Sequence, residues 1–128
     1  MSSLFVLWLL LTVPVSPADD GATAPQIVTI DTADFQFTPS EVTVERSRPV
    51  LFRVIARISP HAFQIPDLEL EQVIFPPETG ELLATFDEEG EVLFRCRFHH
   101  KQGMVGTVRV VEPGSLLEGA EDKVRGPR

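Results

Sequence analysis

The sequence predicts one all-β domain, a sandwich of about seven to eight strands. Three observations lead to this prediction. Apolar and polar residues alternate in short segments, turn-forming residues recur about every eight to twelve residues, and no segment keeps a convincing helical period. A chain of 128 residues is also long enough to enclose one hydrophobic core.

The first half of the domain contains segments with a two-residue period, separated by turns at Pro39 and Pro49. The segments are residues 27–31, 35–37, 42–45 and 50–58. We expect the last of these to be the longest strand. Its apolar face consists of Val50, Phe52, Val54, Ala56 and Ile58.

The second half continues the pattern to the end of the domain. Pro66-Asp67 and Pro76-Pro77 are expected to end the first two segments, and residues 87–90 form a turn between the next two. The expected strands are residues 61–65, 68–73, 82–86, 92–96 and 105–111.

An apolar segment at the N-terminus predicts export of the protein. We interpret residues 1–18 as a signal peptide, because an apolar run is followed by the small residues Ser16-Pro17-Ala18. The run holds about twelve apolar residues, whereas a helix that spans a bilayer needs roughly 20. A second Ala-x-Ala, Ala22-Thr23-Ala24, competes as the cleavage site and would place cleavage after Ala24. The mature chain is therefore expected in the periplasm or outside the cell, without membrane insertion.

The mature chain is expected to have three parts. Residues 19–25 are small and polar and form a flexible lead-in. Residues 26–112 form the domain, and residues 113–128, with Gly and Pro among charged residues, form a polar tail.

Charge and cysteine content restrict the partners. The formal net charge is −8, and all 11 basic and 19 acidic residues lie after Ala18. This excess of acidic residues argues against nucleic acid and anionic membranes, and favours a cationic partner. The single Cys96 cannot form an internal disulfide, so it is either an idle thiol or a functional one.

Four side chains suggest a mononuclear copper site. Cys96-x2-His99-x4-Met104 provides a thiolate, an imidazole and a thioether from one loop, and His61 provides a second imidazole. Each residue alone has an ordinary explanation as a core or turn residue. Together they match the ligands of an electron-transfer copper site better than a structural zinc or an oxygen-rich site. His100 remains an alternative to His99.

This loop resembles the ligand loop of the cupredoxins, the small blue copper proteins. Phe35-x-Phe37-x-Pro39, Pro76-Pro77 and Phe94-x-Cys96 recur at similar places in that family, so the resemblance covers most of the domain. It implies a Greek-key sandwich, equatorial copper ligands at His61, Cys96 and His99, and an axial ligand at Met104.

The chain also departs from the family pattern. An Asn that follows the first ligand His in plastocyanin and azurin ties that loop to a Ser or Thr after the Cys. Ala62 and Arg97 occupy these positions here, so this connection is absent and we expect a looser site. Arg95 stands where plastocyanin has Tyr.

The resemblance implies a one-electron carrier rather than an enzyme. Its partner would be a cationic redox protein such as a c-type cytochrome, and the protein itself a monomer or weak oligomer. Two alternatives remain open: copper delivery or storage, and a copper-free cupredoxin module for protein contacts.

Overall fold

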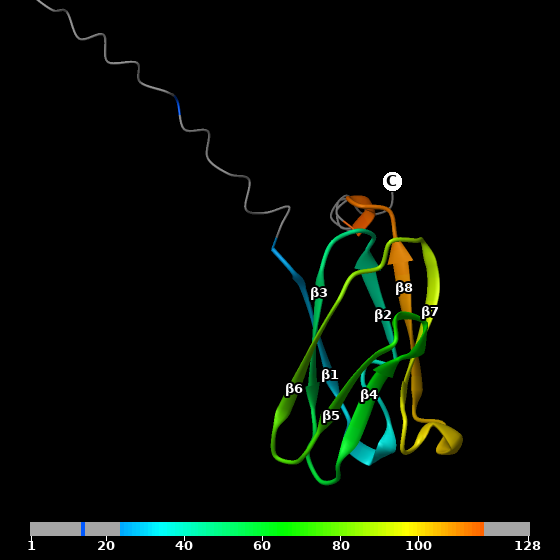
Figure 1. Ribbon diagram of the computed structural model, residues 1–128. Coiled ribbons are helices and arrows are strands. Elements are labelled where there is room, and N and C mark those ends of the chain that lie inside the picture. Colours follow the sequence, from blue (N-terminus) through cyan, green and yellow to red (C-terminus); the bar gives the residue numbers. More distant parts are fainter. Residues whose placement is uncertain (1–13, 15–23, 117–128) are drawn as a thin grey trace, which may run out of the picture.

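The computed structural model describes residue 14 and residues 24–116, and these contain eight strands in two sheets (Figure 1). The strands are β1 (Gln26–Asp31), β2 (Glu41–Glu45), β3 (Val50–Ile55), β4 (His61–Ile65), β5 (Leu70–Ile74), β6 (Thr79–Ala84), β7 (Gly90–Cys96) and β8 (Val105–Val111). Short 3₁₀ helices at Ala33–Phe35, Pro66–Leu68 and His100–Gln102 lie in three connections. The predicted all-β sandwich is confirmed.

Both sheets mix parallel and antiparallel pairs. The smaller sheet has the order β1-β3-β6, and the larger one has the order β2-β8-β7-β4-β5. β1 runs parallel to β3 and β2 runs parallel to β8, whereas the remaining pairs are antiparallel. Parallel neighbours need long connections, so strands distant in sequence meet within each sheet. In the larger sheet, antiparallel pairing of β4 with β7 places the start of β4 beside the end of β7.

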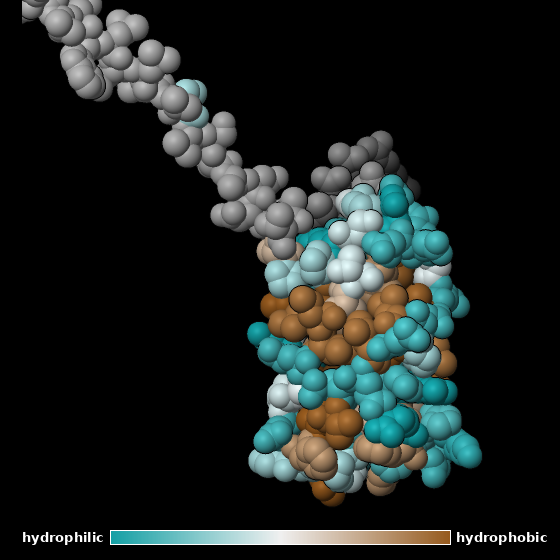
Figure 2. All heavy atoms as spheres, viewed as in Figure 1, coloured by the Kyte–Doolittle hydropathy of each residue, from teal (hydrophilic) through white to brown (hydrophobic). Residues whose placement is uncertain are grey.

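Aromatic side chains fill much of the space between the sheets. The rings of Phe37 and Phe63 both contact the ring of Phe94, with centroid distances of 5.1 and 5.1 Å. Phe52 of β3 reaches Phe63 from the opposite sheet at 5.2 Å. These tilted and edge-to-face contacts make a continuous aromatic core in the same buried cluster as Cys96 and Met104. On the face seen in Figure 2, polar side chains separate apolar areas.

The longest predicted strand ends earlier than expected. β3 stops at Ile55, so the prediction of a strand over residues 50–58 is wrong at its end. Arg57 turns outward and its Nε donates a hydrogen bond to Asp31 Oδ2 at 2.6 Å. Pro60 then supplies no backbone N–H for a sheet, and Ile58 is left 88% exposed.

Three other predicted segments also differ. Phe35 belongs to a 3₁₀ helix rather than a strand, with a positive φ of 56°. The segment predicted from residue 68 begins at Leu70, because Pro66–Leu68 forms a 3₁₀ helix and Glu69 has a left-handed φ of 54°. The segment predicted at residues 82–86 is β6, which is shifted to Thr79–Ala84 because Gly80 pairs with Val54 of β3.

The predicted ends fall largely outside the described residues. This holds for the signal peptide of residues 1–18 apart from residue 14, for residues 19–23 of the lead-in, and for residues 117–128 of the tail. In the described part of the chain, no helix has the length and apolar character needed to cross a membrane.

Candidate metal centre

His61 enters the site as the first residue of β4. Its side chain is buried, with 2% exposed, and the neighbouring strands cover it. Nε2 lies 3.2 Å from the hydroxyl of Ser59, which leaves Nδ1 facing the interior of the site. Burial of the imidazole is the main cause that lowers the pKa of His61. The charge of His99 lowers it further. This shift favours the neutral imidazole, the form that binds a metal.

Cys96 is the last residue of β7 and lies on its inward face. It is fully buried, as is Phe94 two positions earlier, in agreement with the alternation expected from the sequence. Phe63 of β4 is its partner across the sheet. The backbone N–H of Ala62 points at Cys96 Sγ from 3.4 Å and would stabilise a thiolate there.

Backbone hydrogen bonds close the loop that follows Cys96. The N–H of His99 donates to the carbonyl of Cys96 at 3.2 Å, and the N–H of Met104 donates to the carbonyl of His99 at 3.2 Å. The N–H of Cys96 in turn donates to the carbonyl of Met104 at 3.0 Å. Gly103 permits the tight return with a φ of 92°. The loop therefore folds back on Cys96, as its glycines predicted.

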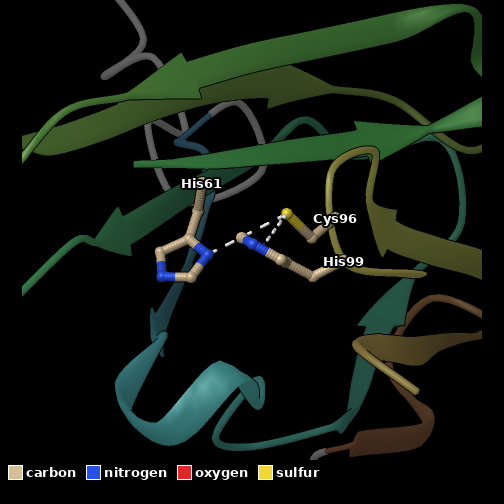
Figure 3. A group of neighbouring side chains, drawn as sticks. All are labelled: His61, Cys96 and His99. Atoms are coloured by element: carbon tan, nitrogen blue, oxygen red, sulfur yellow. Dashed lines mark hydrogen bonds between the residues drawn. The ribbon is translucent and has the colours of Figure 1, made fainter. Parts of the chain in front are cut away.

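Three potential ligand atoms meet above the aromatic core. Nδ1 of His99 lies 3.5 Å from Cys96 Sγ, and Nδ1 of His61 lies 3.9 Å from it (Figure 3). The ligand atoms of these three residues all lie within 4.8 Å of one another. Two imidazole nitrogens and one sulfur around a common point fit a copper ion. Zinc accepts the same donors, but its structural sites are usually closed by four strong ligands.

Met104 and His100 are placed differently. Met104 is fully buried, and its backbone is bonded to both Cys96 and His99. His100 lies in the next 3₁₀ helix, and its Nδ1 donates to the carbonyl of Arg97 at 3.0 Å. The structure thus brings His99, and not its neighbour, to the sulfur.

The two arginines beside Cys96 point to polar partners. Arg95 Nε donates to Gln64 Oε1 at 2.8 Å, and Arg97 Nε lies 2.8 Å from Glu71 Oε2. The Arg97 backbone N–H also donates to the carbonyl of Ala62 at 3.2 Å. This bond joins the two ligand-bearing segments at the positions where the sequence lacks the Asn connection. The loss of that connection therefore does not leave the segments untied.

Phe35 covers the two histidines, a role that the sequence analysis did not assign. Its ring centroid lies 4.8 Å from that of His99 and 6.0 Å from that of His61, both edge-to-face. Phe35 is 51% exposed, so one side of its ring meets solvent while its other side covers the two imidazoles. The Phe35-x-Phe37 pattern was visible in the sequence, but the positive φ that turns Phe35 toward the site was not.

Comparisons with known proteins support the same fold. A family model described as a cupredoxin-like domain matches residues 2–110. A comparison with curated protein sequences gave no match.

Three solved structures are similar at low sequence identity. The periplasmic domain of cytochrome oxidase subunit II from Bradyrhizobium japonicum is 15% identical, with a TM-score of 0.66, over 78% of this chain and 94% of that one. The metal-binding domain of a Cu(I)-exporting P-type ATPase from Streptococcus pneumoniae is 17% identical, with a TM-score of 0.60, over 67% and 85%. Plastocyanin from Dryopteris crassirhizoma is 18% identical, with a TM-score of 0.54, over 66% and 100%. At these identities the likeness shows the fold alone.

Proposed function

The chain belongs to the family of proteins with a cupredoxin-like domain, and we propose that it is an exported type 1 copper protein that carries single electrons. The observation that supports this most directly is the buried sulfur of Cys96 with an imidazole nitrogen of His61 and of His99 on either side. Met104 is the proposed fourth ligand. Bound copper would supply a one-electron Cu(I)/Cu(II) couple.

The protein's own contribution is a fixed and dry ligand set. Burial of His61 and Cys96 excludes water from the donors, and the N–H of Ala62 stabilises negative charge on the sulfur. The three backbone bonds of the Cys96–Met104 loop limit rearrangement. A donor set that moves little when the charge changes favours fast electron transfer, because little reorganisation is needed.

His99 is the proposed route by which the electron leaves. It is the one half-exposed member of the three-residue cluster, whereas His61 and Cys96 are buried. The exposed rings of Phe35 and Phe98 lie against it, with Phe98 at a centroid distance of 6.3 Å. A partner that docks on this end would approach the site through one imidazole edge.

The proposed partner is a cationic redox protein such as a c-type cytochrome. Asp67, Asp87 and Glu88 border one surface hollow of about 310 Å³ beside the start of β7, at the other end of that strand from Cys96. Other acidic side chains are already paired, since Glu71 contacts Arg97 and Glu91 contacts Arg109. The unshared acidic groups would attract a positively charged surface. We propose that the protein acts as a monomer or weak oligomer and has no catalytic role.

A second candidate function is copper delivery or storage. It is favoured by the fold shared with the metal-binding domain of a Cu(I) exporter, at 17% identity. For such a role the metal must exchange between proteins, whereas a carrier must retain it through many oxidation cycles.

One experiment separates these functions. The mature protein is loaded with one equivalent of Cu(II), and its visible and EPR spectra and cyclic voltammogram are recorded. A carrier gives an intense thiolate-to-copper band and a reversible one-electron wave, with metal retained against a moderate chelator. Rapid loss of Cu(I) to a chelator would favour delivery, and no copper uptake would reject both functions.

Cys96→Ser is the matched variant in that experiment. It should lose the intense band while the fold persists, because the aromatic core does not depend on a metal. Cooperative unfolding followed by circular dichroism checks the fold. An equally coloured serine variant would exclude Cys96 as the thiolate ligand.

A further inference from the structure

We infer that the Glu71–Arg97 ion pair is a positioning device for the metal centre. This inference rests on the proposed copper function and adds two residues to it that touch neither the metal nor its ligand atoms. Arg97 follows Cys96 directly in the chain and precedes His99 by two residues, whereas Glu71 lies in β5.

Arg97 makes three contacts that converge on the ligand-bearing segments. Its Nε lies 2.8 Å from Glu71 Oε2, and its guanidinium carbon lies 5.0 Å from the centroid of the Phe98 ring. That ring lies edge-to-face against the ring of His99. The Arg97 backbone N–H bonds the carbonyl of Ala62, next to His61. One residue therefore connects the strand β5 to both ligand histidines.

The strand order determines which segments this ion pair connects. β4 lies between β5 and β7, so the pair joins the loop after Cys96 to a strand that is not its direct neighbour. The side chain of Gln64 in β4 accepts a hydrogen bond from Arg95. Glu71, which lies opposite Gln64 in the β4–β5 register, is the carboxylate that Arg97 reaches instead.

Arg97 also occupies one of the two positions at which this chain lacks the Asn-based connection of plastocyanin and azurin. The sequence replaces an Asn-based connection between two ligand loops with Ala62 and Arg97. In the structure a backbone bond joins those loops, and the side chain of Arg97 is free to attach the second loop to β5. We expect the pair to act on the local position of the loop rather than on global stability, because half-exposed ion pairs contribute little to folding.

Four variants test the inference: Glu71→Gln, Arg97→Gln, the double variant, and the charge exchange Glu71→Arg with Arg97→Glu. Competition with a chelator gives the Cu(II) dissociation constant, and EPR gives the copper hyperfine splitting. Each single variant should raise the dissociation constant about two- to fivefold, which corresponds to the measured range for exposed pairs. The double variant should do no worse than a single one, and the charge exchange should restore part of the loss.

A second readout does not need metal. In the apo protein, hydrogen exchange at the amides of His99 and Met104 should accelerate about two- to fivefold in Glu71→Gln, because both amides hold the loop closed. The control is Glu81→Gln, which breaks the Arg53–Glu81 pair, 3.1 Å long and also half-exposed, on the smaller sheet. The control should change neither exchange at these amides nor copper affinity.

The outcomes distinguish failure of the inference from failure of the proposed function. One outcome is that the wild-type protein binds copper with a thiolate band while Glu71→Gln has the same dissociation constant, hyperfine splitting and amide exchange rates. In that case the ion pair does not position the loop. Equal changes in Glu71→Gln and Glu81→Gln would likewise overturn the inference, since any surface ion pair would then suffice. If the wild-type protein takes up no copper, the proposed function fails, while hydrogen exchange still decides whether the pair holds the loop.

Discussion

At the scale of single residues, adjacent histidines in one loop have different environments. His99 turns Nδ1 toward the sulfur of Cys96, and His100 turns Nδ1 toward a backbone carbonyl. Sequence spacing favoured His99, but it could not show what occupies the ring nitrogen of His100. The difference makes the two residues a matched pair for mutation.

We expect His99→Gly and His100→Gly to have opposite consequences for the copper spectrum. His99→Gly removes a proposed ligand and opens a space that added imidazole should fill, with a change in the visible band. His100→Gly removes a hydrogen bond to the carbonyl of Arg97 and should leave the spectrum nearly unchanged. Titration of both copper-loaded variants with imidazole makes the comparison. The reverse result would make His100 the ligand.

Met104 should influence the redox potential more than Arg97 does. Met104 is fully buried, and a weak thioether donor does little to stabilise Cu(II). Arg97 is half-exposed and paired with Glu71, so solvent and its partner reduce its effect to on the order of tens of millivolts. We therefore expect Met104→Gln to lower the potential further than Arg97→Gln, and Met104→Leu to raise it. Protein-film voltammetry measures all three, and an unmoved potential in Met104→Gln would remove Met104 from the ligand set.

At the scale of elements, β7 and β8 approach each other closely below the site. A Cβ built on Gly106 would overlap the ring of Phe94 and the carbonyl oxygen of Ser40. A rigid ring and a backbone atom cannot move aside at low cost. At Gly80 the nearest atoms instead all belong to side chains, those of the buried Ile74 and of Gln72, and none belongs to the backbone.

We expect Gly106→Ala to destabilise the protein more than Gly80→Ala. Overpacking in a well-packed core costs about 1–3 kcal/mol, and the cost is smaller where neighbouring side chains can rotate. Urea denaturation followed by circular dichroism gives the midpoint of each variant. If the dependence of unfolding free energy on urea is unchanged, the midpoints report stability. Equal midpoints would mean that β7 and β8 can separate to accept the methyl group.

The end of β1 carries an ion pair that makes stability depend on pH. A hydrogen bond from Arg57 lowers the pKa of Asp31, and a second one from the backbone of Ala33 adds to it. Because the folded pKa lies below the unfolded one, this contribution is present above the ordinary Asp pKa of 3.8 and is lost as the pH falls through the folded pKa. The stability difference between wild type and Asp31→Asn should therefore shrink in acid. Thermal unfolding at a series of pH values measures it, and a difference that stays constant would contradict the assignment.

Local spacing explains which parts of the site could be predicted from the sequence. Cys96, His99 and Met104 lie in one short loop, so their grouping follows from spacing and from the glycines that bend the chain. His61 was recognised because its residue type completed the ligand set. Phe35 was not, because its role depends on a left-handed backbone that Phe rarely adopts. Glu71 could not be recognised from the sequence, since only the strand order brings it to Arg97.

At the scale of the whole molecule, the fold places the candidate metal centre and the ends of the described chain at opposite ends of the sandwich. The 3₁₀ helix Ala33–Phe35 and the connection between β7 and β8 lie at one end, and residues 24 and 112–116 lie toward the other (Figure 1). A lead-in or tail therefore attaches away from His99. Residues 24 and 112–116 therefore do not cover the proposed docking surface around His99.

The net charge of −8 should steer a cationic partner toward the protein. Steering of this kind raises association rates about tenfold or more and weakens as the screening length falls to about 8 Å at physiological salt. We expect the second-order rate of electron transfer to a cationic cytochrome to fall steeply with ionic strength. Stopped-flow kinetics with a neutral small oxidant provides the control, because its rate should not depend on salt.

The acidic hollow lies beside the start of β7, at the other end of that strand from Cys96, so it should act on the approach of the partner through charge and not by docking at the site. Asp67, Asp87 and Glu88 border it together, so Asp67→Asn, Asp87→Asn and Glu88→Gln in one variant remove three charges from one place. The comparison variant removes three charges elsewhere, at Glu41, Glu78 and Glu81. Both variants have the same net charge, so a larger loss of rate and of salt dependence in the first would show that the charges of the hollow contribute more to attraction of the partner than other acidic groups do. Equal losses would mean that the partner responds only to total charge, and a rate independent of ionic strength in the wild-type protein would exclude steering altogether.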